Sequence, residues 1–140
     1  MYLLDTNVVS ELRKVNQGKA DVNVVAWDAS VDATDLYLSV ITVQELEIGV
    51  RLAERRDTAQ GALLRTWLHS HVLPAFDGRI LNVDIAVALR SAALHVPNPC
   101  SIPDSLIAAT ALVHGMTVVT RNVADFASTG VVMINPWDAH

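Results

Sequence analysis

The opening stretch Met1-Tyr2-Leu3-Leu4-Asp5-Thr6-Asn7 decides the predicted fold, because it places an acid at the end of a short apolar run. Such a run predicts a buried strand. Open α/β sheets gather their functional groups at the carboxyl ends of strands, so Asp5 is the first candidate metal ligand. The alternative is that Asp5 or Thr6 only caps a helix over residues 8–12, since Asp and Thr are both favoured N-caps.

The length and composition of the chain limit the number of domains and the kind of protein that it can be. The 140 residues fit one domain, residues 1–140, with one hydrophobic core. The chain is 51% hydrophobic but has no apolar run near the roughly 18 to 20 residues that span a bilayer, so we expect no membrane partner. No basic segment or small-residue cleavage site precedes the first predicted strand, and we therefore expect a cytoplasmic protein without a secretory signal.

Charge and cysteine content narrow the class further. Cys100 is the only cysteine, which excludes an internal disulfide and a multi-cysteine zinc site. The net charge of −5 argues against binding nucleic acid through overall electrostatics, so local charge must decide. Two groups of cations are candidates for basic patches, and the second has the spacing of a solvated helix face: Arg13, Lys14 and Lys19; Arg51, Arg55 and Arg56.

Strand and helix patterns alternate along the whole chain. After the opening strand, further strands are predicted over residues 36–40, 79–83, 116–120 and 131–134. Helical spacing lies between them, including a helix capped by Asp21, one over residues 58–72 with Trp67 on its buried face, and one from Ile85 to Ala93. This order predicts an α/β fold, with a mostly parallel sheet of four to five strands and helices on both faces.

Two of the predicted helices carry features that bear on the site. A capping-box pattern at Thr42-Val43-Gln44-Glu45 predicts the start of the helix after the second strand. Gly49 lies inside that helix, where close packing of another backbone would explain it. Residues 105–113, opened by Ile102-Pro103-Asp104, are apolar on nearly every side and predict a helix inside the fold.

Four acids occupy comparable places beside these strands. Asp5 ends the first strand, Glu45 begins the helix after the second, Asp104 begins the buried helix before the fourth, and Asp125 follows the fourth. Each has a purely structural alternative: a cap for Asp5, a capping-box partner for Glu45, a favourable helix dipole for Asp104 and a turn for Asp125. Their joint placement favours a shared acidic centre.

Convergence of these acids would require neutralisation. Two carboxylates about 4 Å apart repel by ~4 kcal/mol at an effective dielectric near 20, so protons or divalent cations must neutralise the group. A donor set made only of oxygen favours Mg²⁺ or Mn²⁺ over zinc. A cation of that kind lowers the pKa of bound water and polarises a phosphate, which is the chemistry of phosphodiester hydrolysis.

The motifs together resemble those of the PIN-domain ribonucleases, specifically the VapC/FitB-like toxins of bacterial type II toxin–antitoxin pairs. The resemblance spans nearly the whole chain and implies a PIN-like three-layer sandwich. It rests on residues 3–11, residues 39–46 with Gly49, residues 104–111, Thr120-Arg121-Asn122 through Asp125-Phe126, and Asn135-Pro136-Trp137.

The resemblance implies a Mg²⁺- or Mn²⁺-dependent endoribonuclease whose metal ligands are Asp5, Glu45 and Asp104. Many relatives place Asp directly after Thr-Arg, where this chain has Asn122, so the fourth catalytic position lies open between Asn122 and Asp125. An Asn ligates through its carbonyl oxygen but adds no negative charge. Three polar residues either orient ligands and water or serve as caps and strand-end groups: Thr6, Asn7 and Thr120.

The same resemblance implies the partners. They are an RNA substrate, a cognate antitoxin whose tail blocks the acidic groove, and a second copy of the chain in a homodimer or dimer of dimers. Operator DNA would be reached only through the antitoxin.

Two other functions compete with the ribonuclease. A haloacid-dehalogenase-like phosphatase also opens with a strand ending in Asp, but it needs a second Asp where this chain has Asn7. A catalytically silent PIN-fold binding module would keep the fold but has little reason to hold three acids at strand ends.

Overall fold

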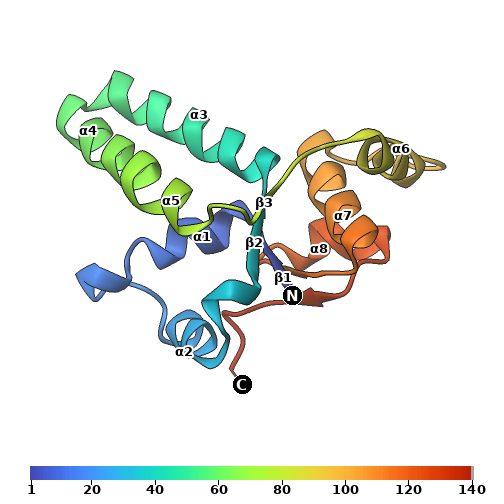
Figure 1. The fold of residues 1–140 in the computed structure, drawn as a ribbon, viewed down its shortest axis with the longest axis horizontal. Helices are drawn as coiled ribbons and strands as arrows, with labels where there is room; N and C mark the ends of the chain where they lie inside the picture. Colours follow the sequence, from blue (N-terminus) through green and yellow to red (C-terminus); the bar gives the residue numbers. More distant parts are fainter. Residues whose placement is uncertain (140) are drawn as a thin grey trace.

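A computed structural model describes residues 1–139 and contains a five-stranded sheet with helices on both faces (Figure 1). The strand order is β3-β2-β1-β4-β5, and every neighbouring pair is parallel. This confirms the predicted α/β class and the parallel sheet. The predicted domain extends to His140, which lies outside the described residues. The strands are β1 (Tyr2–Leu4), β2 (Leu36–Ser39), β3 (Ile80–Leu81), β4 (Thr117–Val119) and β5 (Met133–Ile134).

Helices and short helical turns connect the strands. Among the described residues no helix combines the length and the apolar character that a bilayer crossing demands. The helices are α1 (Thr6–Leu12), α2 (Val22–Ser30), α3 (Val40–Arg56), α4 (Thr58–Trp67), α5 (Leu73–Ala75), α6 (Ile85–Leu94), α7 (Ile102–His114) and α8 (Val123–Phe126). The turns are η1 (Val15–Gln17), η2 (Ala33–Asp35), η3 (Leu68–Val72) and η4 (Ala127–Thr129).

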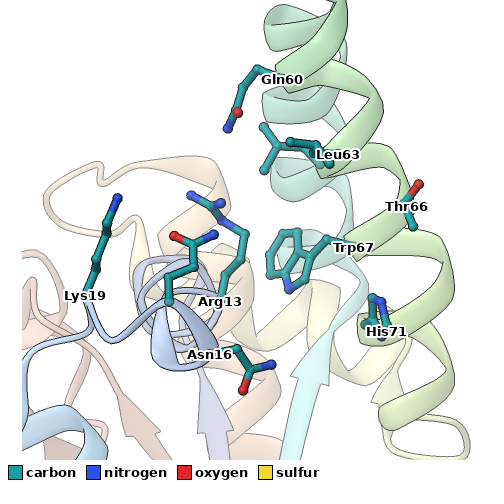
Figure 2. A pocket seen from close by; sticks show the side chains of 10 residues that line it. Arg13, Asn16, Lys19, Gln60, Leu63, Thr66, Trp67 and His71 are labelled. Carbon is teal, nitrogen blue, oxygen red and sulfur yellow. The ribbon is translucent and has the colours of Figure 1, made fainter.

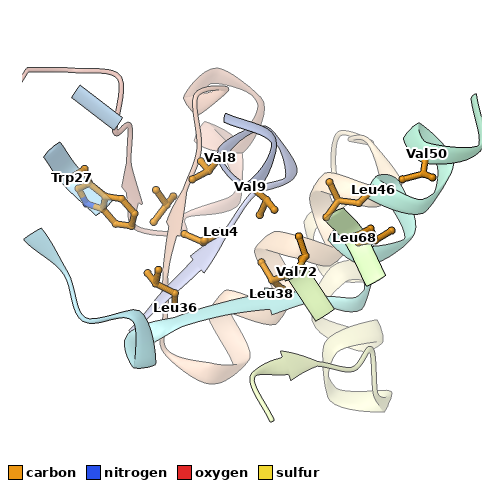
Figure 3. Close-up of a cluster of buried hydrophobic side chains, with 11 residues drawn as sticks. Leu4, Val8, Val9, Trp27, Leu36, Leu38, Leu46, Val50, Leu68 and Val72 are labelled. Atoms are coloured by element: carbon orange, nitrogen blue, oxygen red, sulfur yellow. The ribbon is translucent and has the colours of Figure 1, made fainter. Parts of the chain in front are cut away.

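Adjacent side chains of β1 point to opposite faces of the sheet, because side-chain direction alternates along a strand. Leu4 belongs to the larger core cluster, where Val8 of α1, Trp27 of α2 and Leu46 of α3 also pack (Figure 3). Leu3 points into the second cluster. The central strand therefore joins two cores, one on each face of the sheet.

The second core lies under α7, which packs against α6 beside the sheet (Figure 1). Ile107, Ala108 and Ala111 of α7 are fully buried there with Val118 of β4. The prediction of an apolar helix inside the fold is confirmed for this face of α7. Its last turn is more open, since Val113 is 40% exposed.

The start of α3 differs from its prediction. The helix begins at Val40, and its N-cap is Ser39, whose hydroxyl accepts a hydrogen bond from the Ile41 N–H. The predicted capping box at Thr42 is therefore wrong, because the strand ends earlier and the helix already has a cap. Glu45 consequently lies in the second turn of α3, where it has no backbone group to cap.

The close backbone contact predicted for Gly49 occurs instead at Gly61. A Cβ built on Gly49 meets nothing within 4 Å, whereas one built on Gly61 would lie 2.4 Å from the Glu54 Cα. Gly61 belongs to α4 and Glu54 to α3, which pack against each other in Figure 1. The absence of a side chain on α4 thus lets these two helices approach closely.

The helix predicted over residues 58–72 is divided. Regular α-helical geometry ends at Trp67, and residues Leu68–Val72 form a π-helical turn that leads into α5. π-helical turns are rare and often lie near functional sites. Two predicted strands are also shorter than expected, because only Ile80–Leu81 and Met133–Ile134 pair with the sheet.

Ion pairs on the outer surface hold α3 to α4. Arg65 of α4 donates to Glu47 and to Glu54 of α3, the second at 2.8 Å. The hydrogen bond from Arg65 lowers the pKa of Glu47 to about 2. Arg51 also pairs with Glu47 at 2.7 Å, which confirms that this cation lies on a solvated helix face.

Candidate active site

The acidic residues lie where the strand order reverses. β1 lies between β2 and β4: the chain passes from β1 to β2 and β3 on one side, and then crosses over to β4 and β5 on the other side. Open α/β sheets bind ligands outside the carboxyl ends of their strands at such a switch point. Asp5 directly follows β1, Thr120 directly follows β4, and α3 with Glu45 follows β2. Parallel pairing therefore brings three distant segments to one edge of the sheet.

Asp5 is buried and held by hydrogen bonds on both carboxylate oxygens. The residue is 5% exposed. Its Oδ1 accepts from the Thr6 N–H at 2.8 Å, as an N-cap of α1 would. Its Oδ2 accepts from the Thr120 hydroxyl at 2.8 Å and from Asn7 Nδ2 at 3.3 Å. The capping alternative thus explains Oδ1 only. The other oxygen, Oδ2, is oriented by the side chains of Thr120 and Asn7, which play no part in capping α1.

Thr6 connects Asp5 with Glu45. The Thr6 hydroxyl donates a 2.6 Å hydrogen bond to Glu45 Oε1 while its backbone N–H donates to Asp5. One residue therefore orients carboxylates from two segments of the chain. The capping-box role for Glu45 is excluded by the start of α3 at Val40.

Asp104 lies in the first turn of α7, behind the N-cap Ser101, and is partly buried. Burial raises the pKa of Asp104, and the charges of Asp5, Asp125 and Glu45 raise it further. Burial also raises the pKa of Asp5, with smaller contributions from the charges of Glu45 and Asp125. The negative charges of Glu45 and Asp125 therefore act on Asp5 and on Asp104 and disfavour the ionised forms of these two residues.

The structure places Asp125 and Asn122 differently with respect to this group. The charge of Asp125, in α8, acts on both Asp5 and Asp104. Asn122 contributes a backbone N–H that donates to the Thr120 hydroxyl at 2.9 Å, and its side chain makes no cap to α8. Asn122 thus supports the hydroxyl that holds Asp5.

Asn7 and Thr120 belong to the same hydrogen-bonded set. Asn7 Nδ2 lies 3.5 Å from the Thr120 hydroxyl, and Asn7 Oδ1 accepts from the Arg121 N–H at 3.3 Å. From the sequence alone, Arg121 is only a member of the Thr120-Arg121-Asn122 motif, with no predicted role in the site, because this contact is made by its backbone and has no side-chain signature. These bonds fasten the loop after β4 to the start of α1.

The donor set fits a hydrated divalent cation better than a closed metal cage. As the side chains of residues 1–139 are placed, no three His, Cys, Asp or Glu groups converge as ligands of one ion. Mg²⁺ commonly binds through one or two carboxylates and keeps several waters. The buried Asp5, whose pKa is raised by burial and by the charges of Glu45 and Asp125, suits such an ion because the ion relieves this repulsion.

Comparison with known proteins decides the family. The model of the PIN-domain family matches residues 2–131. The chain belongs to the PIN-domain family. This excludes the phosphatase alternative and agrees with the predicted resemblance.

This PIN domain is similar over its length to curated toxins and ribonucleases. It is 40% identical over 142 residues to Toxin FitB of Neisseria gonorrhoeae, covering 98% of this chain and 99% of FitB. It is 40% identical over 144 residues to VapC ribonuclease Y4jK of Sinorhizobium fredii, covering 99% of each chain. The structure of FitAB bound to an IR36 DNA fragment matches with a TM-score of 0.89 and 37% identity, covering 100% of this chain and 98% of that one.

Proposed function

We propose that this PIN domain is the toxin of a type II toxin–antitoxin pair and acts as an endoribonuclease that hydrolyses RNA phosphodiesters. The observation that carries the proposal is the acidic centre, in which Thr6 hydrogen-bonds to both Asp5 and Glu45 while burial raises the pKa of Asp5 and of Asp104. Close similarity to a protein named a toxin and to one named a VapC ribonuclease supports it.

In the proposed mechanism Asp5, Glu45 and Asp104 would hold Mg²⁺ or Mn²⁺, some of them through bound water, and Asp125 would add negative charge beside them. When bound, such a cation would supply a water of lowered pKa and charge stabilisation for the phosphate. The chain's own part is to fix the ligands. Thr120 and the Thr6 N–H fix the two oxygens of Asp5, and the Thr6 hydroxyl fixes Glu45. Partners of this kind orient metal ligands and raise their affinity.

The remaining parts of the proposal concern the setting of the protein. Residues 1–140 form one PIN domain that works in the cytoplasm, where RNA is its substrate. It assembles as a homodimer or dimer of dimers and is held inactive by a cognate antitoxin. Operator DNA is reached only through that antitoxin, because the chain itself carries a net charge of −5.

Cleavage of single-stranded RNA by the purified protein tests the proposed chemistry. We expect cleavage with Mg²⁺ or Mn²⁺ that stops when a chelator is added, because carboxylates alone activate water poorly. Asp104→Asn, shown to be folded, should lose nearly all of this activity. Undiminished cleavage in excess EDTA would contradict the metal-dependent mechanism. A folded wild-type protein that cleaves no RNA with either metal would favour the silent binding module.

Expression in cells tests the proposed biology. Induction of the protein alone should arrest growth, and the protein encoded beside it should relieve the arrest by binding directly. Sequencing RNA ends after brief induction would identify the cleaved RNA. Harmless unrestrained expression in the native host would refute the toxin assignment.

A further inference from the structure

A groove with a volume of about 680 Å³ lies between residues 13–19, which follow α1, on one side and α4 on the other. Figure 2 shows Arg13 and Lys19 along one side of the groove and Gln60, Leu63 and Trp67 along α4 on the other. This volume lies within the range of roughly 300–1,000 Å³ for ligand sites.

The charge of this groove is opposite to that of the protein. Its lining includes the cations Arg13 and Lys19 and no Asp or Glu, although the whole chain carries −5. Lys14, their neighbour in sequence, is neutralised by Glu11 at 3.1 Å. Within residues 1–139 neither Arg13 nor Lys19 forms an ion pair. The groove therefore presents two cations that are available to an anionic ligand.

The groove also offers an aromatic surface. Trp67 is partly buried at its wall, and the Arg13 guanidinium carbon lies 5.9 Å from the centre of the Trp67 ring. Beside it Leu63 is 68% exposed and adds apolar surface to the groove. Proteins that bind single-stranded nucleic acid combine a basic groove with aromatic rings on which bases stack.

A second hollow lies between the groove and the acidic centre. A smaller cavity of about 200 Å³ is lined by Thr6 and Glu45 at one end. Arg13 and Trp67 line this cavity as well as the groove. An RNA strand that leaves the acidic centre beside Glu45 would therefore pass Arg13 and Trp67, which border both hollows.

We propose that this groove binds the single strand of RNA that extends from the cleavage site, with Arg13 and Lys19 facing phosphates and Trp67 offering a stacking surface. The inference rests on the proposed ribonuclease function and assigns its substrate-binding groove. RNA fits better than a protein segment because the groove presents cations and amide groups without acids, the latter from Asn16, Gln17 and Gln60. Side-chain amide groups form hydrogen bonds with base edges and with phosphates.

Binding of fluorescently labelled single-stranded RNA in EDTA tests the groove, because chelation separates binding from cleavage. The variants are Arg13→Gln, Lys19→Gln and Trp67→Leu, and the matched control is Arg90→Gln on the exposed surface of α6. Each lost phosphate contact should lower the slope of log affinity against log salt by about 0.7. Loss of stacking at Trp67 should weaken binding by roughly 5-fold to 100-fold. The control should match the wild type.

Folding is controlled by the choice of variants. Trp67 packs against the core, so Trp67→Leu counts only if its thermal unfolding matches the wild type, and Trp67→Phe should retain most of the affinity. Lys19 is exposed and its substitution leaves the core untouched, so the test does not depend on Trp67.

The outcomes separate this inference from the proposed function. Equal RNA affinity and equal salt slope for Lys19→Gln, Arg13→Gln and the control would refute the assignment of the groove to RNA. The ribonuclease function would still hold if the wild type cleaves RNA. Groove-dependent binding by a wild-type protein that cleaves no RNA would support the groove and refute the nuclease. Variants that keep RNA affinity but no longer bind the antitoxin would overturn the assignment, since the groove would then be a protein-docking surface.

Discussion

The Thr6 hydroxyl donates a 2.6 Å hydrogen bond to Glu45 Oε1 across 39 positions of sequence. We predict that Thr6→Val, which keeps the shape and removes the donor, lowers metal-dependent cleavage by roughly 10-fold to 100-fold, as loss of such ligand partners commonly does. Thr6→Ser should retain activity because it keeps the hydroxyl. Cleavage rates across a Mg²⁺ titration provide the measurement. Equal rates for Thr6→Val and the wild type would show that Glu45 needs no orientation from Thr6.

The two candidates for the fourth position should respond differently to a change in charge. Asp125 acts electrostatically on Asp5 and Asp104, so we expect Asp125→Asn to weaken metal binding by roughly 10-fold, equivalent to about 1.4 kcal/mol. Asn122→Asp should change little, since Asn122 supports Thr120 through its backbone. Metal titration of the folded variants gives the measurement. Tighter metal binding by Asn122→Asp would assign the fourth position to Asn122 instead.

Metal should stabilise the protein more at neutral than at acidic pH. The pKa values of Asp5 and Asp104 are raised in the folded protein, so the folded state binds protons more tightly than the unfolded state. Without metal, the free energy of unfolding should therefore fall as pH rises through the raised pKa values of Asp5 and Asp104. Above these pKa values the whole loss of stability from ionising the two carboxyls remains. Mg²⁺ relieves the penalty only where the carboxylates are ionised. We expect the gain in Tm from Mg²⁺ over EDTA to be larger at pH 7 than at pH 5.

The control for this experiment is a carboxyl outside the acidic centre. Burial also raises the pKa of Asp28, which lies in α2. Asp28→Asn should keep the full gain from Mg²⁺ at pH 7, whereas Asp104→Asn should lose most of it. An equal gain in Asp104→Asn and Asp28→Asn would place the stabilising metal elsewhere.

The two helical glycines should respond to alanine with opposite signs. Gly49→Ala should raise the free energy of unfolding by up to about 1 kcal/mol, because the added Cβ meets nothing within 4 Å and Ala is the better helix former. Gly61→Ala should lower it, because its Cβ would lie 2.4 Å from the Glu54 Cα and force α3 and α4 apart. Urea unfolding of both variants measures the difference. Stabilisation by Gly61→Ala would mean that the two helices separate at no cost.

The sequence was informative wherever the deciding interactions are local. Alternating strand and helix patterns predicted the parallel sheet, and the nearly continuous apolar surface of residues 105–113 predicted a buried helix. Local patterns failed at the start of α3, where a capping box at Thr42 competed with the true cap at Ser39. They also missed the π-helical turn at Leu68–Val72, whose geometry depends on packing against the core.

By itself, the sequence determined that acids follow successive predicted strands, since Asp5 and Glu45 hold those positions in any fold with these strands. Only the tertiary structure decided which polar groups hold them. The hydrogen bonds from Thr120 to Asp5 and from Thr6 to Glu45 join segments whose proximity depends on the order β2-β1-β4. Likewise the contact between Arg13, just after α1, and Trp67 of α4 depends on how these two segments are placed in the fold. No local pattern encodes these contacts, because strand order is set by burial of both sheet faces at once.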